Sequence, residues 1–266
     1  MTYTPIIADR RPHLLPATHP PNNMAAILTP THLTVLDQQT LKHPPSSTNP
    51  SCLLPPFPSS LAWCSEINSI FFASASSGIM QYDLTSGALQ DVLTTSDHSG
   101  PYTALLSKDR GNTVIYARGQ QIIGLSTSSG KVSHKYETHK TSVSSLSLSN
   151  DSSLLASTSA HAIHVHNLTL GSHTVLRGIP SGSGTISTCA FHHHSRTRLL
   201  VGVGAQLLVY DTTRPSGPVK TITLDKDQKN PGPIVAITCS PFSKTLVAAA
   251  CSGGTISLID LEKEKA

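Results

Sequence analysis

The sequence is poor in charged and aromatic residues, and it contains no apolar run long enough to cross a membrane. Only 13% of its 266 residues are charged and 5% are aromatic, with a single tryptophan. The apolar runs at residues 69–75 and 198–203 are far shorter than the ~20 residues that a membrane helix needs. The first thirty residues also lack the basic region followed by an apolar core that marks a signal peptide. We therefore expect an intracellular protein that does not bind membranes.

Paired cysteines and catalytic motifs are also missing. The five cysteines are Cys52, Cys64, Cys189, Cys239 and Cys251. Because none of them forms a Cys-x-x-Cys pair, they indicate small buried side chains in a reducing compartment rather than a metal knuckle or a disulfide framework. The sequence has no phosphate loop ending in Gly-Lys-Ser/Thr and no His-Glu-x-x-His motif. We predict that the protein is not an enzyme and uses no cofactor, metal or small-molecule substrate.

One pattern recurs along the whole chain. Six times, a short apolar stretch ends in a small polar or acidic residue, and successive endings lie 41 to 49 residues apart. The six endings are Asp37, Asp83, Ser126, Asn167, Asp211 and Asp260. A period of about 40–45 residues built from short strands is typical of a propeller blade. Helical periodicity is nearly absent, so we predict an all-β fold.

The interval that ends at Asn167 shows the repeating unit best. Alternation and β-branched residues predict strands at residues 143–148, 154–158, 163–167 and 173–177, with a turn at 150–153. The fourth strand is the polar, outer one. A four-stranded sheet has two faces to cover, and radial stacking of neighbouring sheets covers both. We therefore predict a β-propeller with six recognisable blades, about five of them complete, which is compatible with a seven-bladed ring.

The propeller should extend over residues 25–261. Residues 1–24 are expected to form an N-terminal tail that offers a closing strand at residues 3–8, and residues 262–266 form a charged C-terminal end. Residues 42–58 contain many prolines, which prevent regular strand pairing, and are expected to form a long extended loop. Closure of the ring needs residues 3–8, a partner, or residues beyond this chain, and we expect the natural protein to be longer.

The repeating units resemble WD40 repeats. Tyr82-Asp83 and Tyr210-Asp211 stand where that family usually has Trp-Asp, and Thr138-His139 stands where Gly-His is usual, as does Asp97-His98. Residues 240–247 match the family's Ser-Pro hairpin. The resemblance implies a WD40-type propeller that serves as a protein-binding scaffold. No third strand carries a tryptophan, so the family's buried network of Asp, His, Ser/Thr and Trp is not complete in any blade.

Within that family, two subfamilies share motifs with this chain. Residues 59–63 with 73–78, residues 138–140 and residues 166–178 resemble, in the same order, the propeller of centrosomal adaptors that target the gamma-tubulin ring complex. This resemblance implies recruitment of gamma-tubulin complexes to spindle poles for microtubule nucleation. Residues 61–63 and 142–146 also resemble propeller subunits of the small-subunit processome. That alternative implies ribosome biogenesis in the nucleolus, with contacts to pre-rRNA or its proteins.

Basic residues form the only candidate interaction surface that the sequence indicates. The chain has a formal net charge of +4 and a pI near 8.8. The candidate residues are Lys131, Lys135, Lys140, Arg196 and Arg198. Such a surface suits an acidic protein or RNA. Because no aromatic residues alternate with these charges to stack on bases, we favour a protein partner over RNA.

Two groups of histidines and the acidic strand ends complete the candidates. His192, His193 and His194 are adjacent, but neighbouring strand residues point to opposite faces, so we favour a solvated hairpin over a metal site. His164 and His166 lie on one predicted third strand, where we expect them on opposite sides in ordinary blade packing. The carboxylates at the strand ends, Asp83, Asp211 and Asp260, are expected to bind the amides of their own turns.

Overall fold

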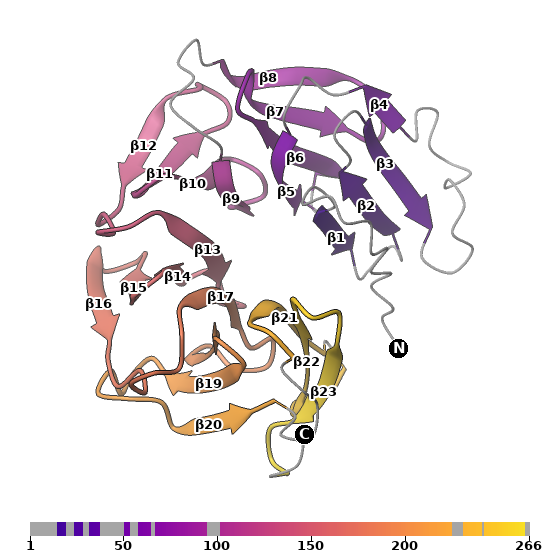
Figure 1. The fold of residues 1–266 in the computed structure, drawn as a ribbon. Helices are drawn as coiled ribbons and strands as arrows, with labels where there is room; N and C mark the ends of the chain where they lie inside the picture. Colours follow the sequence, from indigo (N-terminus) through magenta and orange to yellow (C-terminus); the bar gives the residue numbers. More distant parts are fainter. Residues whose placement is uncertain are drawn as a thin grey trace. The chain divides into compact units, whose positions relative to one another are not determined.

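The computed structural model describes residues 15–19, 24–28, 32–37, 51–53, 58–64, 67–94, 102–224, 231–240 and 242–263. These residues form an all-β structure, and none of them lies in a helix. The chain divides into two compact units, residues 1–136 and 137–266 (Figure 1). Each unit contains three antiparallel sheets.

In the first unit, each sheet has four strands. The strands are β1 (Leu15–His19), β2 (Met24–Leu28), β3 (His32–Asp37), β4 (Ser51–Leu53), β5 (Pro58–Cys64), β6 (Ser69–Ser74), β7 (Gly78–Asp83), β8 (Leu89–Thr94), β9 (Tyr102–Lys108), β10 (Thr113–Arg118), β11 (Gln121–Ser126) and β12 (Val132–Lys135). Within every sheet, each strand pairs with the one that follows it in the chain.

The described residues of the second unit form two four-stranded sheets and one sheet of three strands. The strands are β13 (Val143–Leu148), β14 (Leu154–Ser159), β15 (Ala162–Asn167), β16 (Ser172–Leu176), β17 (Ile186–Phe191), β18 (Arg198–Val203), β19 (Gln206–Asp211), β20 (Lys220–Thr223), β21 (Ile234–Cys239), β22 (Leu246–Cys251) and β23 (Ile256–Asp260). A succession of such sheets, each a simple up-and-down meander, is a β-propeller-like fold.

Hydrophobic cores lie between successive sheets of the same unit. Leu199, Val201 and Tyr210 of the β17–β20 sheet pack with Ile163 and Val165 of the preceding sheet. On the other face of the β17–β20 sheet, a second core joins it to the β21–β23 sheet. The first unit repeats this arrangement, with one core between its first and second sheets and another between its second and third. The sheets are therefore held together by contacts with their neighbours, as in other repeat proteins.

Polar contacts between the first strands repeat with the period of the sequence. The hydroxyl of Ser145 accepts a hydrogen bond from the Cys189 amide at 3.3 Å, and Ser147 accepts one from Phe191 at 2.9 Å; both pairs are 44 residues apart. The thiol of Cys239 contacts the carbonyl of Phe191 at 3.8 Å, across 48 residues. Since equivalent positions of adjacent sheets are in contact, each repeat of the sequence pattern corresponds to one sheet.

Burial differs systematically among the strands. All six residues of the second strands β6 and β14 are buried, whereas every residue of the fourth strand β12 is exposed. In β16 only Leu176 is buried. The prediction that the fourth strand is the polar one is therefore confirmed.

The strands predicted for the interval that ends at Asn167 are also confirmed. The structure has strands at Val143–Leu148, Leu154–Ser159, Ala162–Asn167 and Ser172–Leu176, each within one residue of its expected bounds. Ser152 adopts a positive φ of 54° in the turn between the first two. This left-handed conformation is uncommon outside glycine, so the φ of Ser152 marks a tight turn between the two strands.

The N-terminal region holds strands inside two segments that we expected to be irregular. Strand β1 lies within residues 1–24 and pairs with β2. Strand β4 lies within the proline-rich residues 42–58 and pairs with β3. The proposed closing segment, residues 3–8, lies outside the described residues, as do residues 264–266 of the charged end.

The carboxylates at the strand ends bind their own turns, as predicted. Asp83 accepts hydrogen bonds from the amides of Thr85 and Ser86 at 2.7 and 2.9 Å. Asp211 accepts bonds from the amide and the hydroxyl of Thr213, and Asp260 accepts one from the amide of Glu262. These donors favour the ionised form, so the pKa of each carboxyl lies below its usual value of 3.8.

Candidate functional site

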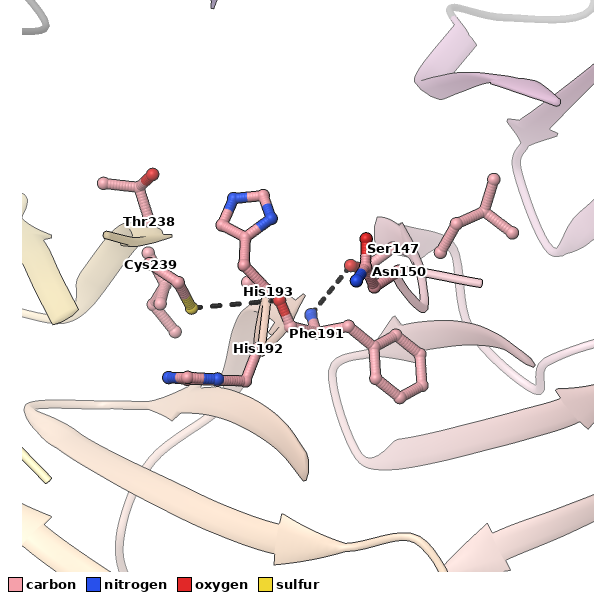
Figure 2. A pocket seen from close by; sticks show the side chains of 10 residues that line it. Ser147, Asn150, Phe191, His192, His193, Thr238 and Cys239 are labelled. Carbon is pink, nitrogen blue, oxygen red and sulfur yellow. Dashed lines mark hydrogen bonds between the residues drawn. The ribbon is translucent and has the colours of Figure 1, made fainter. Parts of the chain in front are cut away.

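A recess lies at the ends of the three first strands of the second unit (Figure 2). Its volume is about 360 Å³. The residues that line it are Ser147, Leu148, Asn150, Ala190, Phe191, His192, His193, Ile237, Thr238 and Cys239. We call this site the recess. Each of the three sheets contributes the last residues of one strand, so the recess exists only where successive repeats pack together.

Two contacts fix the walls of the recess. The Ser147 hydroxyl accepts the hydrogen bond of the Phe191 amide, and the Cys239 thiol points to the Phe191 carbonyl (Figure 2). Phe191, the last residue of β17, thus links β13 of the preceding sheet with β21 of the following sheet. Asn150, His193 and Thr238 are exposed, so their polar groups face solvent at the opening.

The thiol and the imidazole of the recess are not set up for nucleophilic chemistry. Burial raises the pKa of the Cys239 thiol to about 11, so the thiol is protonated at neutral pH and is a poor nucleophile. Burial, with a smaller contribution from Arg198, lowers the pKa of His192. The His192 Nδ1 atom accepts a hydrogen bond from the His194 amide at 3.2 Å, which places the proton of the neutral ring on Nε2. The recess therefore presents neutral hydrogen-bonding groups.

An ion pair joins the two turns beside the recess. Arg196 lies in the turn after β17, and its Nε atom is 2.9 Å from a carboxylate oxygen of Asp151 in the turn after β13. The hydroxyls of Ser149 and then Ser153 are the main reason why the pKa of Asp151 falls to about 2. Because this pair is solvent-exposed, it orients the turns more than it stabilises the fold.

The predicted basic surface is divided between the two units. Lys131 and Lys135 are exposed in the first unit, next to and on β12. Lys140 is exposed in the segment before β13, and Arg196 forms the ion pair with Asp151. Arg198 is half-buried at the start of β18. Within the second unit, Arg198 bonds the His192 amide of the recess through its carbonyl, and Arg196 pairs with Asp151, next to the lining residue Asn150. The basic surface as a whole remains a prediction.

The histidine triplet is only partly solvated. His193 and His194 are exposed, as expected for a hairpin, but His192 is only 1% exposed. The rings of His192 and His193 point in different directions (Figure 2). Among the described residues, no group of three His, Cys, Asp or Glu side chains is arranged to hold a metal ion.

Our expectation that His164 and His166 lie on opposite sides of their strand is wrong. Residues two apart on a strand point to the same face. Their ring centroids are 6.1 Å apart, on the face opposite to Ile163 and Val165, which belong to the hydrophobic core. Together with His139 and His173 they form a cluster that the sequence reading missed. The signal for it was the i, i+2 spacing of two histidines on one strand.

Comparisons with family models and with curated proteins found no relative. The likeness to WD40 repeats therefore rests on the motifs quoted above. Within the part of the chain that the structure describes, no helix is long and apolar enough to span a membrane.

Proposed function

We propose that this protein is a non-enzymatic scaffold of the WD40 type that binds protein partners through the recess and the turns around it. The recess carries this proposal, because three successive sheets each contribute residues to a single cavity with a volume of about 360 Å³. Such a cavity suits a side chain or a short loop of a partner protein.

The chemistry of the recess supports a binding role over a catalytic one. The buried Cys239 thiol is protonated and His192 is neutral, so both line the recess as packing groups and neither is an activated nucleophile. Asn150 and Thr238 add neutral donors and acceptors at the opening. A partner that binds here presents polar, uncharged groups.

As the partner we propose a gamma-tubulin complex, which the protein would recruit to spindle poles for microtubule nucleation. The collinear resemblance at residues 59–63, 138–140 and 166–178 supports this choice. The alternative is a ribosome-assembly role in the nucleolus, which the shorter resemblance at residues 61–63 and 142–146 supports.

Affinity purification of the tagged protein, followed by mass spectrometry, tests both levels of this proposal. We expect a defined set of proteins to be recovered, and Thr238→Arg, which fills the recess, should abolish recovery while the circular dichroism spectrum stays unchanged. Thr174→Arg is the matched control, since Thr174 is also an exposed strand residue but lies on β16.

The identity of the recovered proteins then separates the two roles. Gamma-tubulin complex subunits would support the spindle-pole role, and ribosomal processing factors would support the nucleolar one. Equal recovery by Thr238→Arg and Thr174→Arg would show that the recess does not bind the partner.

A further inference from the structure

Four histidines lie together in the second unit, away from the recess. We call His139, His164, His166 and His173 the histidine cluster. His139 comes from the segment before β13, His164 and His166 from β15, and His173 from β16. The rings of His139 and His164 stack with centroids 4.0 Å apart, and His173 lies 5.7 Å from His164 and 5.9 Å from His166. Three of the four rings are at most 9% exposed, and only His173 is open to solvent.

Two serine hydroxyls of β14 connect the cluster. His139 bonds Ser159 through Nδ1 at 2.9 Å and Ser157 through Nε2 at 2.8 Å. The Ser157 hydroxyl also contacts Nε2 of His166 at 3.4 Å. A neutral imidazole has one donor and one acceptor, so the Ser157 hydroxyl can donate to one of its two rings and accept from the other, while Ser159 bonds only His139 of the cluster. These bonds hold the segment that carries His139 against β14 and β15 while the rings are neutral.

Few charged groups surround the cluster within its own unit. Strands β13 and β14 have no titratable side chain, β15 supplies only His164 and His166, and β16 supplies only His173. The segment before β13 supplies Glu137, His139 and Lys140, and the neighbouring turns contain Asp151 and His161. Of the carboxylates, Glu137 alone acts on His164 in the direction that favours its protonated form.

The folded structure therefore disfavours the protonated form of His139 and His164. Burial, followed by the neighbouring His164, lowers the pKa of His139 to about 4. Burial, followed by His173, lowers the pKa of His164. An unfolded histidine has a pKa near 6.5, so this contribution to stability is complete above about pH 6.5 and is lost as the pH falls below it.

We propose that the histidine cluster is a pH-dependent switch, which keeps residues 137–142 on the β13–β16 sheet when its rings are neutral and releases them when the rings take up protons. The release of residues 137–142, which we call the open form, exposes β14 and β15. For one buried neutral ring, the equilibrium shifts toward the open form by up to about tenfold for each pH unit below 6.5. Between pH 6.5 and pH 4.5 this amounts to about 40-fold for a ring whose pKa is about 4 when folded.

Hydrogen exchange of the full chain, measured by mass spectrometry at several pH values and corrected for intrinsic exchange, tests the switch. Peptides from β14 and β15 should lose about 40-fold in protection between pH 6.5 and 4.5. Peptides from β22 and β23 are the internal control, because residues 231–263, which contain the β21–β23 sheet, include no histidine. An equal loss of protection in both sheets would overturn the switch, since it would indicate global unfolding.

Two matched variants assign the effect to the cluster. His139→Gln keeps one donor and one acceptor for Ser157 and Ser159 but cannot take up a proton. The loss of hydrogen-exchange protection in β14 and β15 should therefore become shallower by up to about tenfold per pH unit. His161→Gln makes the same change at an exposed turn position and should keep the wild-type pH dependence. Identical pH profiles for the wild type and His139→Gln would overturn the proposal.

An NMR titration of the wild-type histidine rings keeps the proposal testable if His139→Gln fails to fold. We expect at least one ring of the histidine cluster to remain neutral at pH 5. If all rings titrate near pH 6.5, the proposal is wrong.

Discussion

Replacing Leu200 by alanine should lower the unfolding free energy of the second unit more than any surface substitution does, because the Leu200 side chain is packed between two sheets. Its side chain is 0% exposed and packs in the core that joins the β17–β20 sheet to the β21–β23 sheet. The change removes three carbon groups, which is about 2.4 kcal/mol in transfer free energy at ~0.8 kcal/mol each. The cavity left behind adds to this, so the total loss of unfolding free energy should be about 2–5 kcal/mol.

Urea denaturation followed by circular dichroism measures this loss. Leu170→Ala is the matched control, since Leu170 is 77% exposed in the turn between β15 and β16. That change should alter the unfolding free energy by no more than about 0.5 kcal/mol. If both variants lose the same amount, or Leu200→Ala loses less than ~1 kcal/mol, packing between successive sheets is not what stabilises this fold.

Three further predictions concern turns, thiols and charge. Asp211→Ala removes the acceptor of two solvent-exposed Thr213 bonds and should cost about 0.5–1.5 kcal/mol of unfolding free energy. Because the pKa of Asp211 is lowered in the folded protein, its contribution to the unfolding free energy is complete above pH 3.8 and is lost as the pH falls further. In urea titrations at acidic pH, the unfolding free energies of the variant and the wild type should therefore converge. The buried thiols of Cys189 and Cys239, each with its pKa raised to about 11, should not react with a thiol reagent at neutral pH until urea unfolds the chain, and fast native labelling would contradict this. In filter binding at low salt we expect no RNA affinity; salt-dependent binding that weakens in Lys131→Gln or Lys135→Gln would favour the ribosomal alternative.

Much of the fold follows from local patterns in the sequence. The strands of the β13–β16 sheet could be placed within one residue, because apolar alternation and the turn residues at 150–153 act over a few neighbouring positions. The roles of Asp83 and Asp211 were likewise predictable, since a carboxylate at a strand end reaches the amides of the next two or three residues.

Other features depend on contacts between distant residues, and the sequence alone does not reveal them. Strands β1 and β4 form inside segments whose prolines and polar residues argue against pairing, because a strand partner overrides the local preference. The recess combines residues from three sheets, with pairs such as Ser147 and Phe191 that are 44 residues apart. The burial of His192 follows from packing around it rather than from its polar neighbours in the sequence.

Nuclear Overhauser spectroscopy on the isotope-labelled chain, with its side chains protonated, tests most directly that each repeat of the sequence is one sheet packed on the next. We predict cross-peaks from the β-protons of Ser147 to the amide of Phe191, and from those of Ser145 to the amide of Cys189. The pairs within each sheet, such as Leu155 with His166, serve as the positive control. If the pairs within the sheets appear and both contacts across 44 residues are missing, successive repeats do not pack as neighbouring sheets, and the recess does not exist.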